Sequence, residues 1–496
     1  MNSRYSYIVA ACLGTVAMLP MVTAEYIPTT DGPAHLYTAT ILRDIGIEGS
    51  ILPDFFEVSL YPLPNWSTQV YFVALSHLVG LRSAEKILLL IYGASFSVAF
   101  VYIARGLGRF TWPYLVIATQ LMLTTTLWLG FYNFAFGVIA LLVTAGYLVR
   151  QSDLSWKATA LLFVFFTITY FTHLLAFVMS LAIACLVVVL RMPRRSWFRV
   201  PLASIPLLLL AIHYFATTGM NESSMSTLFD IWRQNISSGF VSTRFLRINQ
   251  YLFQIWDVHG WGGAFLAVIL GLTLLMRVLY PDWFETVEWP VVSLCVFALL
   301  AAMFLLTPEH LSHSIEHGGV LAVRFCFVAS IFSLLCLPIP KGKLKLGVLG
   351  CAITFFLGNQ IGMASYVSRA SIDIREFVSG IPYVNDSSAL YLMMTPGDRR
   401  EGGYVKRAIS YYCLDSGNVN LAHYQATVSH FQVSFKPDIP RGRGDYESYT
   451  RKDLVDYIIA WDVSKERISS LLEYDIVFCN ERLTVLKKRE SSVLPK

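Results

Sequence analysis

Apolar runs long enough to cross a lipid bilayer recur almost continuously from Tyr5 to about Met363. A helix needs about 20 apolar residues to cross roughly 30 Å of hydrocarbon, and helices satisfy their own backbone hydrogen bonds in lipid. The composition agrees, since 55% of the residues are hydrophobic and only 14% are charged. Residues 1–363 are therefore predicted to form a polytopic α-helical membrane domain.

The distribution of Lys and Arg decides which of twelve candidate runs cross the membrane. If residues 65–80 crossed, the basic clusters at Arg194 and Arg195 and at Lys341 and Lys343 would face the side opposite to Arg4. Lys and Arg concentrate on the cytoplasmic side, so we interpret residues 65–80 as a helix on, or dipping into, the outer leaflet. About eleven transmembrane helices remain, with the N-terminus inside and the C-terminal residues outside: 5–24, 84–104, 112–129, 131–149, 156–172, 174–190, 199–217, 261–279, 290–307, 320–338 and 346–363.

The composition changes sharply after Met363. Residues 364–496 contain 18 Lys or Arg and 17 Asp or Glu, nearly half of all charged residues in the chain. They are therefore predicted to form a C-terminal extracytoplasmic α/β domain, and nothing in its sequence has the pattern of a catalytic motif. Its predicted elements are strands at 389–394, 457–463 and 474–479, a hairpin partner at 481–488, helices at 404–412 and 452–458, and an exposed loop at 437–449.

The cysteines and the charge balance limit the classes of function that the chain can have. Cys413 and Cys479 lie in the outer domain, where a disulfide is permitted, and whether they pair stays open. The chain has no Cys-x-x-Cys, Walker or dinucleotide-binding motif in a suitable context, and its net charge of +5 belongs to loops that flank the membrane. We therefore expect no redox, nucleotide-dependent or nucleic-acid-binding function.

The first outer loop, residues 25–82, carries the most specific chemical pattern, Thr-Thr-Asp-Gly-Pro-Ala-His-Leu-Tyr at 29–37. The break at Gly32 and Pro33 predicts that Asp31 lies in a turn or at a helix N-cap. A carboxylate directly beyond the first span can meet a group that a lipid carrier holds at headgroup level. Asp31 is therefore predicted to act in transfer from a lipid-linked donor, with a plain helix cap as the alternative.

This arrangement resembles the GT-C glycosyltransferases, which include the protein O-mannosyltransferases and the aminoarabinose transferases of lipid A. The shared features are an acid after the first span, a long loop with surface helices, a helical bundle and a terminal outer domain. The resemblance implies that residues 1–363 are a GT-C catalytic domain that takes a sugar from a polyprenyl-phosphate donor. Asp31 matches the family's catalytic base, residues 62–80 its loop helix, and Arg324-Phe325 its late Arg-aromatic pair, in which Arg324 would contact the carrier phosphate.

The second outer loop departs from the family pattern. Many relatives carry another acid there, whereas residues 129–134 of this chain read Leu-Gly-Phe-Tyr-Asn-Phe. Asn133 can hydrogen-bond a sugar or an acceptor but cannot act as a base, which leaves Asp31 as the single base. Direct attack by the acceptor would invert the anomeric configuration, with the Arg324 guanidinium stabilising the phosphate leaving group.

Further candidate substrate contacts lie in other outer segments. His35 could orient the carboxylate or touch the acceptor, and Asn65 ends the Pro-rich part of the first loop. Three histidines before Arg324 share one face of a predicted helix and are expected to bind the donor sugar or phosphate. A divalent metal, the one possible cofactor, is the alternative role for these three residues, His310, His313 and His317.

Other functional classes stay open. A transporter or flippase would place ionisable residues within the spans, and the predicted span interiors contain none. A polysaccharide ligase or another lipid-carrier transferase would share this architecture but use a diphosphate-linked donor, and a non-catalytic scaffold is a third option. The expected partners are the lipid-linked donor, a lipid, glycan or protein acceptor and membrane lipids. The expected location is a bacterial inner membrane with the C-terminal domain in the periplasm, and the sequence does not indicate the sugar or the acceptor.

Overall fold

The structure is a computed structural model in which the residues fall into two compact units. The first unit is Met1–Thr23 with Ile87–Tyr366, and the second is Ala24–Lys86 with Val367–Lys496. The sequence analysis placed residues 25–82 with the membrane domain, whereas the structure groups them with the C-terminal residues. The residues described are 3–217, 230, 233, 244, 248, 252, 262–285, 291–307, 320–394, 403–428, 430–442 and 446–489.

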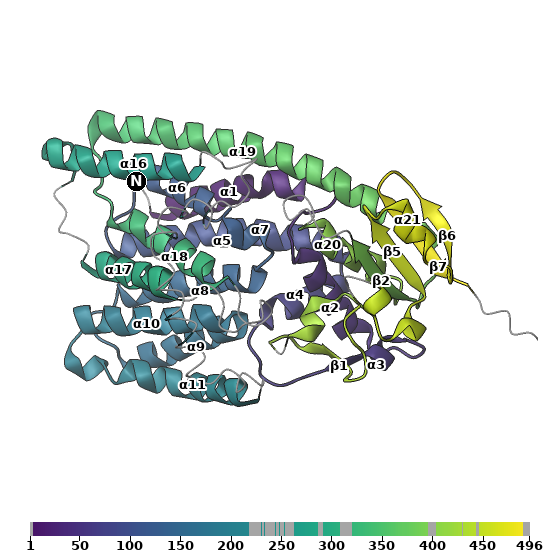
Figure 1. The fold of residues 1–496 in the computed structure, drawn as a ribbon. Helices are drawn as coiled ribbons and strands as arrows, with labels where there is room; N and C mark the ends of the chain where they lie inside the picture. The colour runs from purple at the N-terminus through teal and green to yellow at the C-terminus, as the bar shows by residue number, and fades with distance from the viewer. Residues whose placement is uncertain are drawn as a thin grey trace, which may run out of the picture. The chain divides into compact units, whose positions relative to one another are not determined.

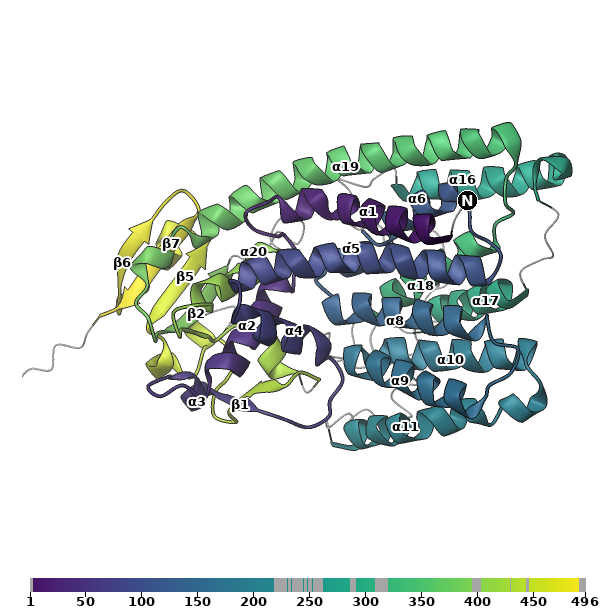
Figure 2. The same cartoon turned by 180° about the vertical axis from the view of Figure 1, so that it is seen from behind.

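Apolar helices make up the described part of the first unit (Figures 1 and 2). Within it α8 packs against α9 and α10, and α11 packs against α9. Two of its helices, α5 and α19, continue into residues of the second unit. The helices are α1 (Ser3–Val22), α5 (Leu81–Gly106), α6 (Trp112–Leu121), α7 (Thr125–Trp128), α8 (Tyr132–Leu148), α9 (Trp156–Thr172), α10 (Leu174–Arg191), α11 (Arg199–Thr217), α16 (Gly262–Leu279), α17 (Val291–Leu306), α18 (Leu321–Cys336) and α19 (Gly342–Val378).

Each predicted span coincides with helix, which confirms the α-helical membrane fold. The span predicted at 112–129 is broken into α6 and α7, because the backbone of Thr124 is extended, with ψ of 173°. The span predicted at 346–363 continues to Val378. Residues 364–378 contain no Gly or Pro, and polar residues do not end a helix. Among the described residues, five helices are long and apolar enough to cross a membrane: Arg4–Val22, Leu81–Gly106, Leu174–Arg191, Arg194–Ala216 and Gly342–Tyr383.

The second unit contains a five-stranded mixed sheet with the strand order β3-β2-β5-β7-β6. β2 is parallel to both β3 and β5, whereas β7 is antiparallel to β5 and β6. β5 is buried along its whole length, as expected for a central strand that is covered on both faces. The bounds are β2 (Ala389–Met394), β3 (Val419–Asn420), β5 (Tyr457–Trp461), β6 (Tyr474–Cys479) and β7 (Leu483–Lys488).

Most elements of the C-terminal part follow the prediction. The strands at 389–394 and 474–479 have the expected bounds, and β7 is the expected hairpin partner. Residues 404–412 form α20 (Val405–Ala408) and the 3-10 helix η5 (Ile409–Cys413). The helix predicted at 452–458 is wrong: only Lys452–Leu454 is helical, because the apolar run from Tyr457 pairs as a strand between β2 and β7.

The first loop folds into the second unit. Its elements are α2 (Gly32–Asp44), α3 (Leu52–Phe55), β1 (Phe56–Val58) and α4 (Ser67–Ser76). β1 pairs antiparallel with β4 (Val433–Phe435), and α2 packs against α4, α20 and η5. At about 1.5 Å per residue, the ten residues of α4 span roughly 15 Å, too short to cross a bilayer.

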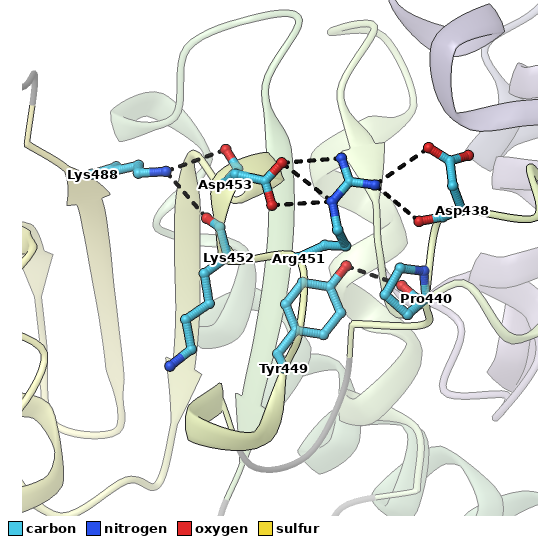
Figure 3. A network of polar contacts seen from close by, with 7 residues as sticks. All are labelled: Asp438, Pro440, Tyr449, Arg451, Lys452, Asp453 and Lys488. Atoms are coloured by element: carbon cyan, nitrogen blue, oxygen red, sulfur yellow. Dashed lines mark hydrogen bonds and ion pairs between the residues drawn. The ribbon is translucent and has the colours of Figure 1, made fainter.

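Polar contacts secure the predicted loop at 437–449 (Figure 3). The Arg451 guanidinium pairs with Asp438 at 3.3 Å and with Asp453 at 3.0 Å, and the Tyr449 hydroxyl donates to the Pro440 carbonyl at 3.0 Å. The Lys488 ammonium donates to the carbonyls of Lys452 and Asp453. Through Arg451 and Asp453, these contacts connect Asp438 of the loop to Lys488 at the end of β7.

All eight cysteines are among the described residues and carry free thiols. Cys413 is buried, whereas Cys479 is exposed and lies beside Thr484. The disulfide that the sequence left open is therefore not formed.

Two glycines allow α1 and α5 to approach closely. A Cβ on Gly93 would meet the Gly14 carbonyl oxygen, and a Cβ on Gly14 would meet the Gly93 carbonyl oxygen. We predict that Gly93→Ala lowers the free energy of unfolding by roughly 1–3 kcal/mol, because the added methyl group overpacks the contact. Unfolding in mixed micelles with increasing SDS measures this change. Gly358→Ala on α19 is the control, since nothing lies within 4 Å of its Cβ position, and equal stability of both variants would contradict the close approach.

Candidate functional site

Asp31 precedes α2 at its N-cap position, as the Gly-Pro break predicted. Pro33 lies in the first turn, where its missing N–H costs nothing, and the His35 N–H donates to the Asp31 carbonyl at 3.1 Å. The Asp31 side chain makes no capping hydrogen bond. The plain-cap alternative is therefore wrong for the carboxylate, which is buried and directed to other groups.

The carboxylate of Asp31 lies beside a cation and a phenol from the C-terminal part of the second unit. The Arg407 Nε is 3.5 Å from Oδ1, and the two side chains are only 16% and 11% exposed. The Arg407 guanidinium stacks on the Tyr424 ring, with Cζ 3.9 Å from the ring centroid. The Tyr424 hydroxyl hydrogen-bonds to Asp31, and removal of this hydroxyl from water, reinforced by the Asp31 charge, raises the pKa of Tyr424 well above its usual value.

His35 and Asn65, two of the predicted substrate contacts, belong to the same unit as Asp31. The His35 ring nitrogen Nδ1 is 3.0 Å from Gln69 Nε2 of α4, and the ring packs edge-on against Phe431 at 5.8 Å between centroids. Asn65 has φ of 68° and its side-chain amide donates to the His430 carbonyl at 3.3 Å. Both side chains thus have protein partners that tie the first loop to the C-terminal residues.

A second polar group lies in the first unit. The Arg324 guanidinium, on α18, lies 4.5 Å above the Phe131 ring centroid and 5.6 Å from that of Phe134. Asn133, between these aromatic residues, is buried. The structure therefore brings Arg324 to the turn that carries Asn133, although 190 residues separate them in the sequence.

His423 lies in the core of the second unit. Its Nε2 is 3.0 Å from the Thr38 hydroxyl, and its ring packs edge-on against Tyr37 at 4.9 Å. Burial lowers the pKa of His423 well below its usual value, with smaller contributions from the charges of Arg407 and Arg441 and from His35. His423 is therefore neutral near pH 7.

The metal hypothesis concerned His310, His313 and His317, which lie outside the described residues. Within the described ranges, no group of three His, Cys, Asp or Glu side chains has the arrangement of a metal site. The possible metal-binding and donor-binding roles of the three histidines stay predictions.

Arg407, Tyr424 and Gln69 were missed by the sequence analysis. Arg407 is one of 18 basic residues after Met363 and no spacing distinguishes it from the others. The triplet His423-Tyr424-Gln425 stands between the apolar positions Leu421-Ala422 and Ala426, and this polar interruption was the available signal. The sequence analysis found no catalytic pattern in the C-terminal part, and the structure shows that two of its side chains, Arg407 and Tyr424, contact Asp31.

The fold of this chain, with its helical bundle, the loop that carries Asp31 and the C-terminal α/β part, is also found in a solved structure. The chain is similar to the crystal structure of ArnT from Cupriavidus metallidurans bound to undecaprenyl phosphate, with a TM-score of 0.54 and 11% sequence identity. The similarity covers 99% of this chain and 98% of that chain. No protein-family model and no curated protein matches the sequence.

A double-mutant cycle tests the Asp31–Arg407 pair. We predict that Asp31→Asn and Arg407→Gln show a coupling of roughly 1–3 kcal/mol in the free energy of unfolding, because removing either partner leaves the other charge buried. Asp475→Asn and Arg489→Gln form the control cycle, since this pair is 61% and 58% exposed and water screens it. Equal coupling in the two cycles would show that the buried pair is not formed.

The neutral state of His423 makes stability depend on pH. Its pKa is depressed in the folded protein and is about 6.5 in the unfolded chain, so below about pH 6.5 only the unfolded chain takes up this proton. We predict that the free energy of unfolding of the wild type falls more steeply from pH 7 to pH 5 than that of His423→Gln, by up to about 1.4 kcal/mol per pH unit. Parallel pH profiles of the two proteins would refute the buried neutral state.

Proposed function

We propose that this protein is a glycosyltransferase that moves a sugar from a polyprenyl-phosphate donor to an acceptor, with Asp31 as the general base. The observation that carries the proposal is the Asp31 carboxylate, which is buried, does not cap its helix and is held by Arg407 and Tyr424. A buried carboxylate with dedicated partners is typical of a functional group. The fold supports the donor class, because the similar ArnT structure is bound to undecaprenyl phosphate.

The reaction needs one base and one phosphate-binding cation. Asp31 takes the proton of the acceptor hydroxyl as its oxygen attacks the anomeric carbon. The bond between that carbon and the phosphate oxygen breaks, and its electron pair leaves with the polyprenyl phosphate. We assign stabilisation of the leaving phosphate to Arg324, whose guanidinium suits two phosphate oxygens. A single displacement inverts the anomeric configuration.

The proposed location follows from the spans and the charge pattern. The chain is an integral membrane protein by its apolar helices. We place it in a bacterial inner membrane with the N-terminus in the cytoplasm and the C-terminal part in the periplasm, because this orientation keeps the basic clusters of the predicted inner loops inside. The acceptor would be a lipid, glycan or protein hydroxyl or amine.

Transfer by the wild type and by Asp31→Asn in nanodiscs tests the proposal. We predict that both bind a radiolabelled polyprenyl-phosphate sugar with similar affinity, whereas label transfer to a membrane extract falls by about 100-fold to 10,000-fold in Asp31→Asn, the range of a lost general base. Asp44→Asn is the control on the same helix, since Asp44 pairs with the neighbouring Arg43 at 2.6 Å.

Other outcomes separate the competing classes. Consumption of a diphosphate-linked oligosaccharide instead of the monophosphate donor would identify a ligase. Equal transfer by the wild type and Asp31→Asn would remove Asp31 as the base, and binding without any transfer by the wild type would favour a scaffold or a transporter.

A further inference from the structure

A chain of hydrogen-bonding side chains links His423 to Asp31. His423 Nε2 is 3.0 Å from the Thr38 hydroxyl, which donates to Gln425 Oε1 through a short hydrogen bond. Gln425 Nε2 donates to the Tyr424 hydroxyl oxygen at 3.2 Å, and this hydroxyl bonds to Asp31. Thr38 and Gln425 are fully buried. Two of the five residues come from the start of the first loop, and three are consecutive in the C-terminal part.

The amide of Gln425 fixes the direction of the whole chain. Its nitrogen only donates and its oxygen only accepts, so Thr38 must give its proton to Gln425 and then accept one from His423 Nε2. At the other end, the Tyr424 oxygen accepts from the amide and its proton remains for Asp31. Every donor therefore points toward the carboxylate, which as an anion only accepts.

The reverse direction leaves two buried groups in poor environments. With the Gln425 amide turned over, the Tyr424 hydroxyl would donate to Gln425 and oppose the Asp31 carboxylate with an oxygen lone pair. His423 would then carry its proton on Nδ1, a buried atom with no hydrogen-bond partner among the described residues. An unpaired buried N–H is rarer and costlier than an unpaired acceptor, so the observed direction is the favoured one.

The surroundings keep the end groups of the chain in the required charge states. Arg407, Arg441 and His35 face His423, and with burial they hold its imidazole neutral. Arg407 also lies beside Tyr424 and Asp31, and its positive charge favours the anionic form of the carboxylate. In a site with little water such a chain is stronger than its separate bonds.

We propose that Tyr424 is a positioning residue for Asp31, and that His423, Thr38 and Gln425 fix the direction of its hydroxyl. The chain directs the Tyr424 proton to the Asp31 carboxylate, the group that takes the proton of the acceptor substrate under the proposed function. The catalytic meaning of this arrangement rests on the proposed function. The hydrogen-bond direction does not, and each can be measured separately.

The tautomer of His423 is the readout that needs no activity. Protein labelled with ¹⁵N-histidine is reconstituted in nanodiscs and examined by NMR between pH 5.5 and 8, with His423→Gln used to assign the signal. We expect a neutral imidazole with its proton on Nε2 throughout this range. A proton on Nδ1, or a charged ring at pH 7, would overturn the proposed direction.

The pH profile of transfer is the second readout. Tyr424→Phe keeps the ring that stacks on Arg407 and removes the donor, so Asp31 should bind its proton more readily and the acidic limb should move up by about one pH unit. Thr38→Val should move this limb the same way by a smaller amount, because Gln425 is then free to turn over. Thr40→Val, a buried threonine of the same helix that bonds only to backbone carbonyls, should leave the profile unchanged.

The two readouts fail independently. An Nε2 proton on His423 with no transfer by the wild type refutes the proposed function and keeps the hydrogen-bond chain. Normal transfer with the same acidic limb in the wild type and Tyr424→Phe refutes the positioning role, provided that donor affinity and the thermal midpoint of Tyr424→Phe match those of the wild type.

Discussion

The docking of α2 against the C-terminal part of the second unit is the interaction on which the site depends. Residues 32–41 of this helix are all buried, although polar side chains such as His35, Thr38 and Thr40 are among them. Buried polar groups need hydrogen-bond partners, and these come from other segments of the unit: Gln69 for His35, and His423 and Gln425 for Thr38. The position of Asp31, directly before the helix, is set by these contacts.

The docking also explains how a carboxylate can be kept away from water. Burial of an unpaired charge is strongly unfavourable, whereas a carboxylate beside a guanidinium and a phenol keeps its charge at lower cost. Arg407 and Tyr424 supply these partners for Asp31 from segments about 380 residues further along the chain. A loop with no such support would present its acid to water. The C-terminal part therefore does more than enclose the loop, because it sets the environment of the proposed base.

Hydrophobic length and alternation in the sequence predicted most of the fold. Runs of about 20 apolar residues located the helices, since this length is imposed by the bilayer, and the strands at 389–394 and 474–479 carried enough apolar residues to be placed correctly. The break at Thr124 and the extension of α19 to Val378 were missed, because hydropathy does not register a single extended residue or a polar continuation of a helix.

The site was predictable only in part. Asp31 stood out because an acid follows an apolar span and precedes a Gly-Pro break. Arg407 and Tyr424 did not, because their role depends on a long-range contact that local spacing does not encode. The helix predicted at 452–458 failed for a related reason: the pairing of Tyr457 with its neighbouring strands outweighed the local helical pattern.

The most direct test of this account is a cryo-EM structure of the Asp31→Asn variant with an intact undecaprenyl-phosphate sugar. The account predicts that the anomeric carbon lies within about 6 Å of the side chain at position 31, which leaves room for one acceptor oxygen at hydrogen-bonding and attack distance. The Arg324 guanidinium would contact the phosphate in the same structure. A sugar bound well beyond that reach, with position 31 still packed against Arg407 and Tyr424, would contradict the role of Asp31 as the base.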